Sequence, residues 1–172
     1  MSVVIRRLVP EDAEALMALR RESLIESPLA FGASPEDDRA GSVEEVRRFL
    51  DEFPDGVTFG AFETDLVGMV GLVRQAKRKM AHKMVIWGVY VQPGHRGTGV
   101  APQLFEAAID HAQALPGVRQ IQLSVSETAP AARKLYERFG FEVWGTEPEA
   151  LQHDGEFVAE HHMSLRIQPQ NP

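Results

Sequence analysis

Residues 84–102 constrain the fold of this chain more than any other segment. Met84 to Val91 reads Met-Val-Ile-Trp-Gly-Val-Tyr-Val and is apolar at both alternating sets of positions. Such a run predicts a central strand that is covered on both faces. Gly94, Gly97 and Gly99 follow within six residues, and glycine lets a main chain approach a ligand closely. A helix over 98–115 is expected next, so the segment predicts a strand, a glycine-rich turn and a helix in succession.

Pro102 indicates where main-chain amides are free in this turn. Proline has no N–H, and deep in a helix it clashes with the carbonyl four residues before it. We therefore expect the amide of Gln103 to be the first helical donor, bonded to the carbonyl of Gly99. The amides of residues 97–101 can then face an anion of pyrophosphate size. The alternative is a glycine-rich turn without a ligand, and neither the P-loop nor the G-x-G-x-x-G pattern is present.

Composition narrows the class of protein. The chain has 172 residues, 44% of them hydrophobic, which predicts a single domain over 1–167 followed by a frayed tail over 168–172. A net charge of −7 argues against nucleic-acid binding, and the lack of cysteine excludes disulfides, thiolate zinc sites and a cysteine nucleophile. No apolar run approaches the roughly 20 residues that span a bilayer, and the start is unlike a signal peptide. We expect a cytoplasmic protein with neither a membrane nor a nucleic acid as partner.

Hydrophobic periodicity and turn residues predict the remaining elements. Further strands are expected at Val3–Leu8, Thr58–Glu63, Leu66–Arg74, Gln120–Val125, Phe141–Trp144 and Val158–Arg166. Further helices are expected after Pro10, from a Ser42 cap to Leu50, and over Ala131–Phe139. Strands cluster early and alternate with helices later, which predicts an α/β (α+β) fold with a mixed sheet and helices on both faces.

Two motifs, about 40 residues apart, give the chain a family resemblance. Arg96 to Ala101 fits the R/Q-x-x-G-x-G/A motif of the Gcn5-related N-acetyltransferase (GNAT) superfamily, and Trp87–Pro93 is similar to the family's fourth strand and its bulge. Ala132 to Phe141 resembles the family's A-x-x-L-Y-x-x-x-G-F segment. The resemblance implies a mostly antiparallel sheet of about seven strands. It also implies that the fourth and fifth strands, 84–91 and 120–125, splay apart.

The resemblance further implies an activity: acetyl transfer from acetyl-CoA to a primary amine of a small molecule or amino acid, by direct attack in a ternary complex. The pyrophosphate would lie on the amides from Arg96 to Ala101, and the pantetheine arm would pair with the main chain of the preceding strand. The implied cofactor-binding residues are Val89, Tyr90, Val91, Arg96, Gly97, Thr98, Gly99, Val100, Ala101 and Tyr136.

Two residues are implied as catalytic. The amide of Val89 would stabilise the negative charge that develops on the thioester oxygen. Tyr136 matches the family tyrosine that protonates the departing thiolate, and a phenol of pKa about 10 keeps its proton at neutral pH. One departure concerns the asparagine that the family often has seven residues earlier, where this chain has Ala129. Its contact is lost or is made by Ser126 or Thr128.

The general base is not evident from the sequence. Many relatives use a glutamate on the fourth strand, but Met84–Val91 contains no acidic residue. The base lies elsewhere or water carries the proton, and the candidates are Glu22, Glu26, His82, Glu160, His161 and His162. Adjacent side chains on a strand point to opposite faces, so His161 and His162 cannot share one metal, and we expect no metal cofactor.

The acceptor side is the least constrained part of the site. The segment Pro28–Ser34 resembles a loop in a broad bacterial group of these enzymes, in which this region shapes the acceptor site. Phe31 and Ser34, with Glu22, are therefore candidate substrate contacts. Two alternatives stay open: an acyl-CoA-binding regulatory module with little or no catalysis, and an acetyltransferase of protein N-termini or lysines. Family members often pair through edge strands, so a homodimer is one expected arrangement.

Overall fold

The computed structural model describes residues 2–52 and 56–168. Seven strands form one sheet in the order β1-β2-β3-β4-β5-β7-β6, and the only parallel pair among these neighbours is β4 with β5. The mixed, mostly antiparallel sheet is thus confirmed. The strands are β1 (Val4–Arg7), β2 (Gly56–Phe62), β3 (Leu66–Arg74), β4 (Lys83–Val91), β5 (Gln120–Ser126), β6 (Glu142–His153) and β7 (Glu156–Arg166).

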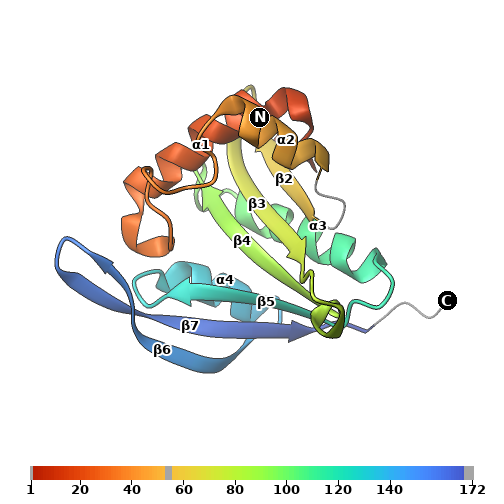
Figure 1. Cartoon of the computed structure of the whole chain (residues 1–172), viewed down its shortest axis with the longest axis vertical. Helices are drawn as coiled ribbons and strands as arrows, with labels where there is room; N and C mark the ends of the chain where they lie inside the picture. Colours follow the sequence, from red (N-terminus) through yellow and green to blue (C-terminus); the bar gives the residue numbers. More distant parts are fainter. Residues whose placement is uncertain (1, 53–55, 169–172) are drawn as a thin grey trace.

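Helices cover both faces of the sheet, as Figure 1 shows. The α-helices are α1 (Ala13–Glu26), α2 (Val43–Glu52), α3 (Val100–Ala114) and α4 (Pro130–Arg138). Four short 3₁₀ helices are η1 (Pro10–Asp12), η2 (Pro28–Ala30), η3 (Arg78–Met80) and η4 (Pro93–His95). Apolar side chains of α3 and α4 pack in one buried cluster, and those of α1 and α2 pack in a second. Within the described ranges, no helix is long and apolar enough to cross a membrane.

Most predicted elements are found near their expected places. The central strand predicted at 84–91 is β4, and the strand predicted at 66–74 is β3. The Ser42 cap of α2 is also confirmed, because the amide of Glu45 donates to Ser42 Oγ at 3.2 Å. The helix expected from Thr98 begins only at Val100, since Gly99 has a φ of +89° and lies outside helical geometry. Of the predicted frayed tail, residues 169–172 lie outside the described residues.

The prediction for the sixth strand is wrong in length. A strand was expected only over Phe141–Trp144, whereas β6 runs from Glu142 to His153. Most positions of β6 are exposed, so its sequence lacks the alternation of apolar and polar residues that reveals a half-buried strand. Asp154 and Gly155, with φ values of +50° and +80°, turn the chain from β6 into β7. This Asp-Gly pair is a common hairpin turn and is the signal that could have extended the prediction.

Strands β4 and β5 pair over only three residues. The pairs run from Lys83 with Gln120 to Val85 with Gln122, after which the two strands diverge (Figure 1). β5 continues to pair with β7 as far as Ser126. Residues 86–91 of β4 therefore border an opening on this side, because no described strand pairs with them there. The splay that the family resemblance implies is thus present.

A bulge interrupts β4 beside this opening. Trp87 pairs with Gly71 and Tyr90 pairs with Met69, so two residues of β4 oppose one residue of β3. The first of the two, Gly88, has a φ of +63°, which glycine adopts without steric cost. The expected bulge is therefore confirmed, and it displaces the main chain of β4 where the strand has lost its parallel neighbour.

Candidate active site

The turn between β4 and α3 presents a row of unused amides. Gly97 and Gly99 have φ values of +75° and +89°, and Thr98 Oγ1 closes the turn by donating to the carbonyl of His95 at 2.6 Å. The amide of Gln103 donates to Gly99 O at 3.3 Å, which confirms the predicted first helical bond. Within the described ranges, the amides of residues 97–101 donate to no acceptor of the protein. Five main-chain donors are thus available at the start of α3.

This geometry fits a diphosphate. A Cβ placed at Gly94 or Gly97 would meet no other atom within 4 Å, so the space above the turn is open. Consecutive amides in a turn with positive φ form an anion-binding concavity, and the start of a helix carries a partial positive charge. α3 is 15 residues long and begins at Val100. The residues present can therefore hold the pyrophosphate of a coenzyme A molecule.

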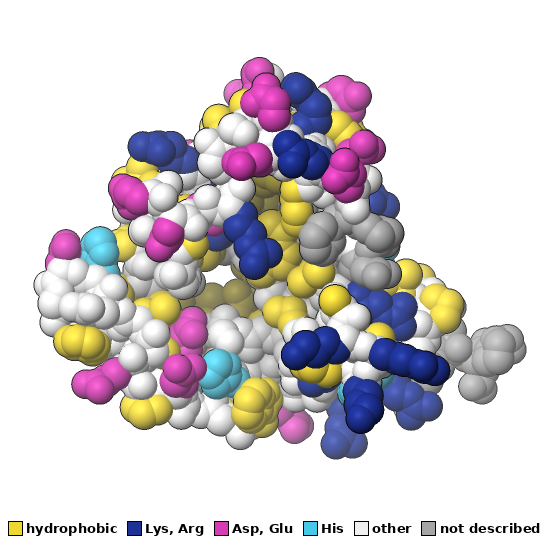
Figure 2. Space-filling model, in the orientation of Figure 1, with side chains coloured by type: hydrophobic (Ala, Val, Ile, Leu, Met, Phe, Trp, Pro, Cys, Tyr) yellow, Lys and Arg dark blue, Asp and Glu magenta, His cyan; other side chains and the backbone are white. Residues whose placement is uncertain are grey.

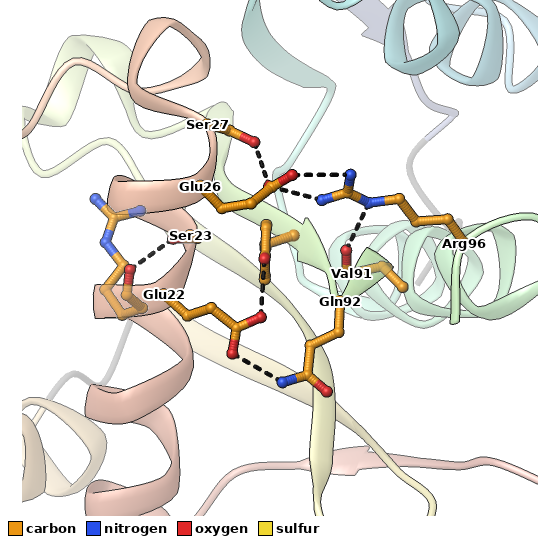
Figure 3. A network of polar contacts seen from close by, with 9 residues as sticks. Glu22, Ser23, Glu26, Ser27, Val91, Gln92 and Arg96 are labelled. Carbon is orange, nitrogen blue, oxygen red and sulfur yellow. Dashed lines mark hydrogen bonds and ion pairs between the residues drawn. The ribbon is translucent and has the colours of Figure 1, made fainter. Parts of the chain in front are cut away.

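The side chain of Arg96 fixes the turn to the rest of the protein (Figure 3). Its Nε donates to Val91 O at 2.9 Å, and its two terminal nitrogens donate to Glu26 at 2.8 and 3.2 Å. The hydrogen bond from Arg96 is the main cause of the lowered pKa of Glu26. Glu26 is thus a weak base, and the guanidinium of Arg96 positions the turn. The amide of Arg96 donates to the carbonyl of Pro93 at 3.3 Å, so the row of unused amides begins at Gly97 and not at Arg96 as expected. The carbonyl of Val91, a predicted cofactor contact, already accepts one hydrogen bond.

Glu22 is likewise committed within the fold. Its carboxylate accepts hydrogen bonds from Tyr90 Oη at 3.0 Å and from Gln92 Nε2 at 2.8 Å, as Figure 3 shows for Gln92. Burial, and next the hydrogen bond to Glu22, raise the pKa of Tyr90. The side chain of Tyr90 packs in the cluster of α1 and α2, so only its main chain lies beside the opening. Because both carboxylate oxygens of Glu22 accept hydrogen bonds from side chains of the protein, its contacts support a structural role and give no support to a role as base or substrate contact.

Tyr136 offers a proton in an apolar setting. Its ring, on α4, stacks on Phe105 with the centroids 4.8 Å apart and also packs near Phe141. Burial raises the pKa of the Tyr136 phenol, which therefore keeps its proton well above neutral pH. Its hydroxyl forms no hydrogen bond with any residue that the structure describes. A buried acid with an uncommitted proton is the feature that a leaving thiolate requires.

The place of the missing asparagine is filled by main chain and hydroxyls. Ala129 caps α4, and its amide donates to Ser126 O at 3.0 Å. The hydroxyls of Ser126 and Thr128 lie 2.8 Å apart, and the amide of Thr128 donates to Ser126 Oγ at 3.2 Å. Ser126 is buried, whereas Thr128 is exposed. Thr128 is therefore the more accessible of the two substitutes that the sequence suggested.

Two candidate bases border the opening from the side of β7. His162 and Glu160 stand opposite Ser124 and Ser126 of β5, beyond the last residue that pairs with β4. His162 Nδ1 lies 2.8 Å from Ser124 Oγ, and Nε2 lies 3.2 Å from a carboxylate oxygen of Glu147. Both ring nitrogens of His162 thus have partners.

Glu160 has the properties of a base. It is half-buried, and burial raises its pKa although nearby His162 acts in the opposite direction. The remaining candidates fit less well: His82 is exposed at the paired end of β4, and His161 Nδ1 lies 2.9 Å from Thr146 Oγ1. No group of three His, Asp or Glu side chains within 2–52 and 56–168 could hold a metal ion.

A cavity of about 440 Å³ lies against the face of the sheet that α1 and α2 cover. Its walls come from α1, α2, the segment 33–40, β3 and β4, and Figure 2 shows the hollow between the helices and the strands, with apolar side chains in its floor. Phe31 packs beside this region against the α1 and α2 cluster. Ala33 lines the cavity, whereas Ser34 donates to Asp37 Oδ1 and lies outside the lining. Sequence reasoning missed the cavity because five separate segments form it.

Comparisons with known proteins agree with this architecture. Over 100 residues the chain is 28% identical to the L-amino acid N-acetyltransferase AaaT of Escherichia coli, covering 58% of this chain and 61% of that enzyme. The chain spans between 46% and 61% of the length of the curated relatives it matches. A GNAT family acetyltransferase from Streptococcus pneumoniae superposes with a TM-score of 0.87 at 25% identity, over 96% of this chain and 100% of that one.

A second solved structure is similar in fold. The putative acetyltransferase yncA of Salmonella typhimurium, solved with its cofactor acetyl-CoA, superposes with a TM-score of 0.85 at 17% identity, over 100% of this chain and 98% of that one. The sequence profile of the acetyltransferase (GNAT) family matches residues 18–141, from α1 to the start of β6. This match includes the bulged strand, the amide-rich turn and the helix of Tyr136, and the chain therefore belongs to the GNAT acetyltransferase family.

Proposed function

We propose that this protein is an acetyl-CoA-dependent N-acetyltransferase that acts on a primary amine of a small molecule or amino acid, by direct attack in a ternary complex. The observation that carries the proposal is the adjacency of two features: the edge of β4 beyond Val85 that faces β5 and pairs with no described strand, and the five unused amides over residues 97–101. An unpaired strand edge can receive an extended chain such as pantetheine. The amides supply the anion site at one end of that edge.

The residues of the opening then have distinct tasks. Acetyl-CoA supplies an acetyl group that is activated as a thioester. The amide of Val89, at the bulge, stabilises the negative charge that develops on the carbonyl oxygen during attack. Tyr136 donates its phenolic proton to the departing sulfur.

Glu160 is the general base in this proposal. The acceptor amine must lose a proton before it attacks, and a carboxyl whose pKa is raised by burial accepts that proton more readily than an exposed one. Glu160 pairs with Ser126, beyond the part of β5 that pairs with β4, on the side where η2 approaches β5 and β6. Glu22 and Glu26 are excluded from this role because Tyr90 and Arg96, respectively, donate to their carboxylates.

A small acceptor is favoured over a protein. The cavity beside β4 has a volume of about 440 Å³, which lies within the usual range for small-molecule sites of roughly 300–1,000 Å³. The curated relative from Escherichia coli is named as an L-amino acid N-acetyltransferase, which supports the same class of acceptor.

The deciding experiment measures two quantities in parallel. Release of free thiol from acetyl-CoA is followed across a panel of amines, amino acids and peptides, and acetyl-CoA binding is measured by calorimetry. The proposal predicts binding together with turnover of at least one small amine. Binding without turnover of any acceptor would favour the idle regulatory module instead, and turnover of peptides alone would favour a protein acetyltransferase.

Location and assembly belong to the same proposal. We propose a single cytoplasmic domain over 1–167, as composition predicts. β1 and β6 are the edge strands of the sheet, and edge strands carry unpaired main-chain groups that can join two subunits. Sedimentation analysis at several protein concentrations tests for the homodimer.

A further inference from the structure

Arg20 lines the cavity, and one of its guanidinium nitrogens has no hydrogen-bond partner among the described residues. Arg20, on α1, donates from Nε to Asp38 Oδ2 at 3.2 Å and from Nη2 to Asp38 Oδ1 at 3.0 Å. Its Nη1 is buried and has no partner within the described part of the chain. Burial of an N–H without a partner is costly in free energy, which points to a ligand group at that nitrogen.

The position of Nη1 ties it to the reaction centre. Nη1 lies 3.6 Å from the place that a Cβ on Gly88 would occupy, so the guanidinium lies beside the bulge of β4. Thr58 Oγ1 and His95 Nδ1 are the other unpartnered buried side-chain atoms found in the described residues, and neither residue lines the cavity. Among these three atoms, Nη1 of Arg20 is therefore the one that belongs to the cavity, and it lies beside the open edge of β4.

The surroundings of Arg20 hold its guanidinium in one place. The guanidinium carbon lies 5.2 Å from the ring of Phe31 and 5.9 Å from the ring of Trp87. Phe49 in turn meets Trp87 edge-on, with the ring centroids 5.6 Å apart. Asp38 occupies one edge of the fork-shaped cation, and the second edge remains available for another carboxylate. Such a fixed donor is suited to recognising a ligand of defined shape.

We propose that Nη1 of Arg20 binds the α-carboxylate of an amino-acid acceptor, an inference that rests on the proposed acetyl transfer. Covalent geometry keeps the α-amine of an amino acid about 3 Å from its carboxylate oxygens. A carboxylate on Nη1 thus places the amine beside Gly88, at the edge where the thioester is presented.

The remaining walls define the side chain of the acceptor. They are mostly apolar or aromatic and include Leu16, Val46, Phe49, Val73, Val85 and Trp87. Asp37 also lines the cavity, but its Oδ1 already accepts the amide and the hydroxyl of Ser34. Arg39 lines the cavity as well and adds a second positive charge. The acceptor is therefore a free α-amino acid with an apolar or aromatic side chain.

The test compares amino acids with amines that lack only the carboxylate. Two suitable pairs are L-methionine with 3-(methylthio)propylamine and L-phenylalanine with 2-phenylethylamine. In the unmodified protein, kcat/KM is expected to be about 100-fold or more higher for the amino acid of each pair, because the amine leaves Nη1 unpaired. In Arg20→Met this ratio falls to within about threefold of one, since the discriminating donor is gone. The exposed neighbour provides the control, and Arg21→Met is expected to keep the original ratio.

The ratio within one variant is independent of how much of that variant folds. Equal kcat/KM values within the pairs for the unmodified protein would overturn the proposal, and so would an unchanged ratio in Arg20→Met. If acetyl-CoA binds but no amine is acetylated, the proposed function fails first. Calorimetry with L-methionine in the presence of coenzyme A then decides the inference: binding that Arg20→Met abolishes supports it, and the lack of binding to the unmodified protein overturns it.

Discussion

Replacement of Tyr136 by phenylalanine separates chemistry from stability. The hydroxyl forms no hydrogen bond with a described residue, and the ring stacks on Phe105 through atoms that phenylalanine retains. Removing the hydroxyl therefore leaves no polar partner unpaired, and the free energy of unfolding should change by less than about 1 kcal/mol. If the phenol protonates the departing thiolate, kcat should nevertheless fall by roughly 10²–10⁴-fold, which corresponds to about 3–5 kcal/mol in the activation barrier.

Tyr90 is the matched control because the chain contains only two tyrosines. Its hydroxyl donates to a carboxylate oxygen of Glu22 at 3.0 Å, and loss of a hydrogen bond to a charged group costs about 1.5–3 kcal/mol. Tyr90→Phe is thus expected to lower the melting temperature by roughly 3–12 °C in a chain of this size, with kcat nearly unchanged. The two variants should show opposite profiles, one losing turnover and the other losing stability.

The assays are steady-state acetyl transfer, which gives kcat, and thermal unfolding on the same preparations. Acetyl-CoA affinity, measured by calorimetry, should be similar in Tyr136→Phe and the unmodified protein. A kcat for Tyr136→Phe within threefold of the original would refute the assignment of the proton donor. An equal loss of stability and turnover in both variants would instead show that Tyr136 acts through packing.

The raised pKa of Tyr136 also predicts the pH dependence of stability. Burial holds the phenol protonated in the folded protein above the value of about 10 that an unfolded chain has. The folded state therefore binds more protons than the unfolded state in alkaline solution, so the contribution of Tyr136 to stability is present below about pH 10 and is lost as pH rises further. Tyr90, whose pKa is also raised, adds to the same decline. Denaturation in urea between pH 8 and pH 11 measures this, and Tyr136→Phe should reduce the decline.

Three further predictions concern the other parts of the site. Gly99→Ala places a side chain at a φ of +89°, which should destabilise this conformation of the turn by about 1–2 kcal/mol. Acetyl-CoA affinity, measured by calorimetry, should then fall by up to roughly tenfold. Gly94→Ala, in open space without positive φ, should bind acetyl-CoA normally, and equal affinities in both variants would contradict a pyrophosphate on this turn. Glu160→Gln should lower kcat and remove the loss of activity at low pH. In the unmodified enzyme this loss is expected because Glu160, whose pKa is raised, takes up a proton as pH falls and can no longer act as base. An unchanged pH profile of activity would show that Glu160 is not the base. Gly71→Ala would put its Cβ 2.0 Å from Cε2 of Trp87, so the indole ring must move towards the cavity. We expect the free energy of unfolding to fall by about 1–3 kcal/mol. The KM for the acceptor should rise, whereas the affinity for acetyl-CoA should stay the same.

Local chemistry made the cofactor side of the protein predictable from sequence. The buried strand, the glycines of the turn and the stop imposed by Pro102 all act within a few residues, and the structure has them where the sequence indicates. β6 was underestimated because an exposed strand carries no apolar alternation. The acceptor side was not predictable for a different reason. The surroundings of the Arg20 guanidinium are formed by Asp38, Phe31 and Trp87, which the fold brings together from separate segments of the chain.

A single inserted residue connects these two sides. Before the bulge, Val85 and Trp87 face the cavity, while Met84 and Ile86 face the cluster of α3 and α4. Strict alternation would continue with residue 89 on the cavity face and residue 90 on the other. Instead, Val89 packs in the α3 and α4 cluster and Tyr90 packs under α1, because the extra residue reverses the alternation.

This reversal has two consequences that a regular strand could not supply together. Tyr90 reaches Glu22 and helps to hold α1 over the end of β4, while the left-handed Gly88 removes the side chain that would otherwise meet Arg20. A larger residue at Gly88 would have to accept positive φ and would crowd Nη1 at the same time. Glycine at the bulge therefore serves both sides at once, because it accepts the positive φ beside the free edge of β4 and keeps the space in front of Nη1 of Arg20 clear for the acceptor.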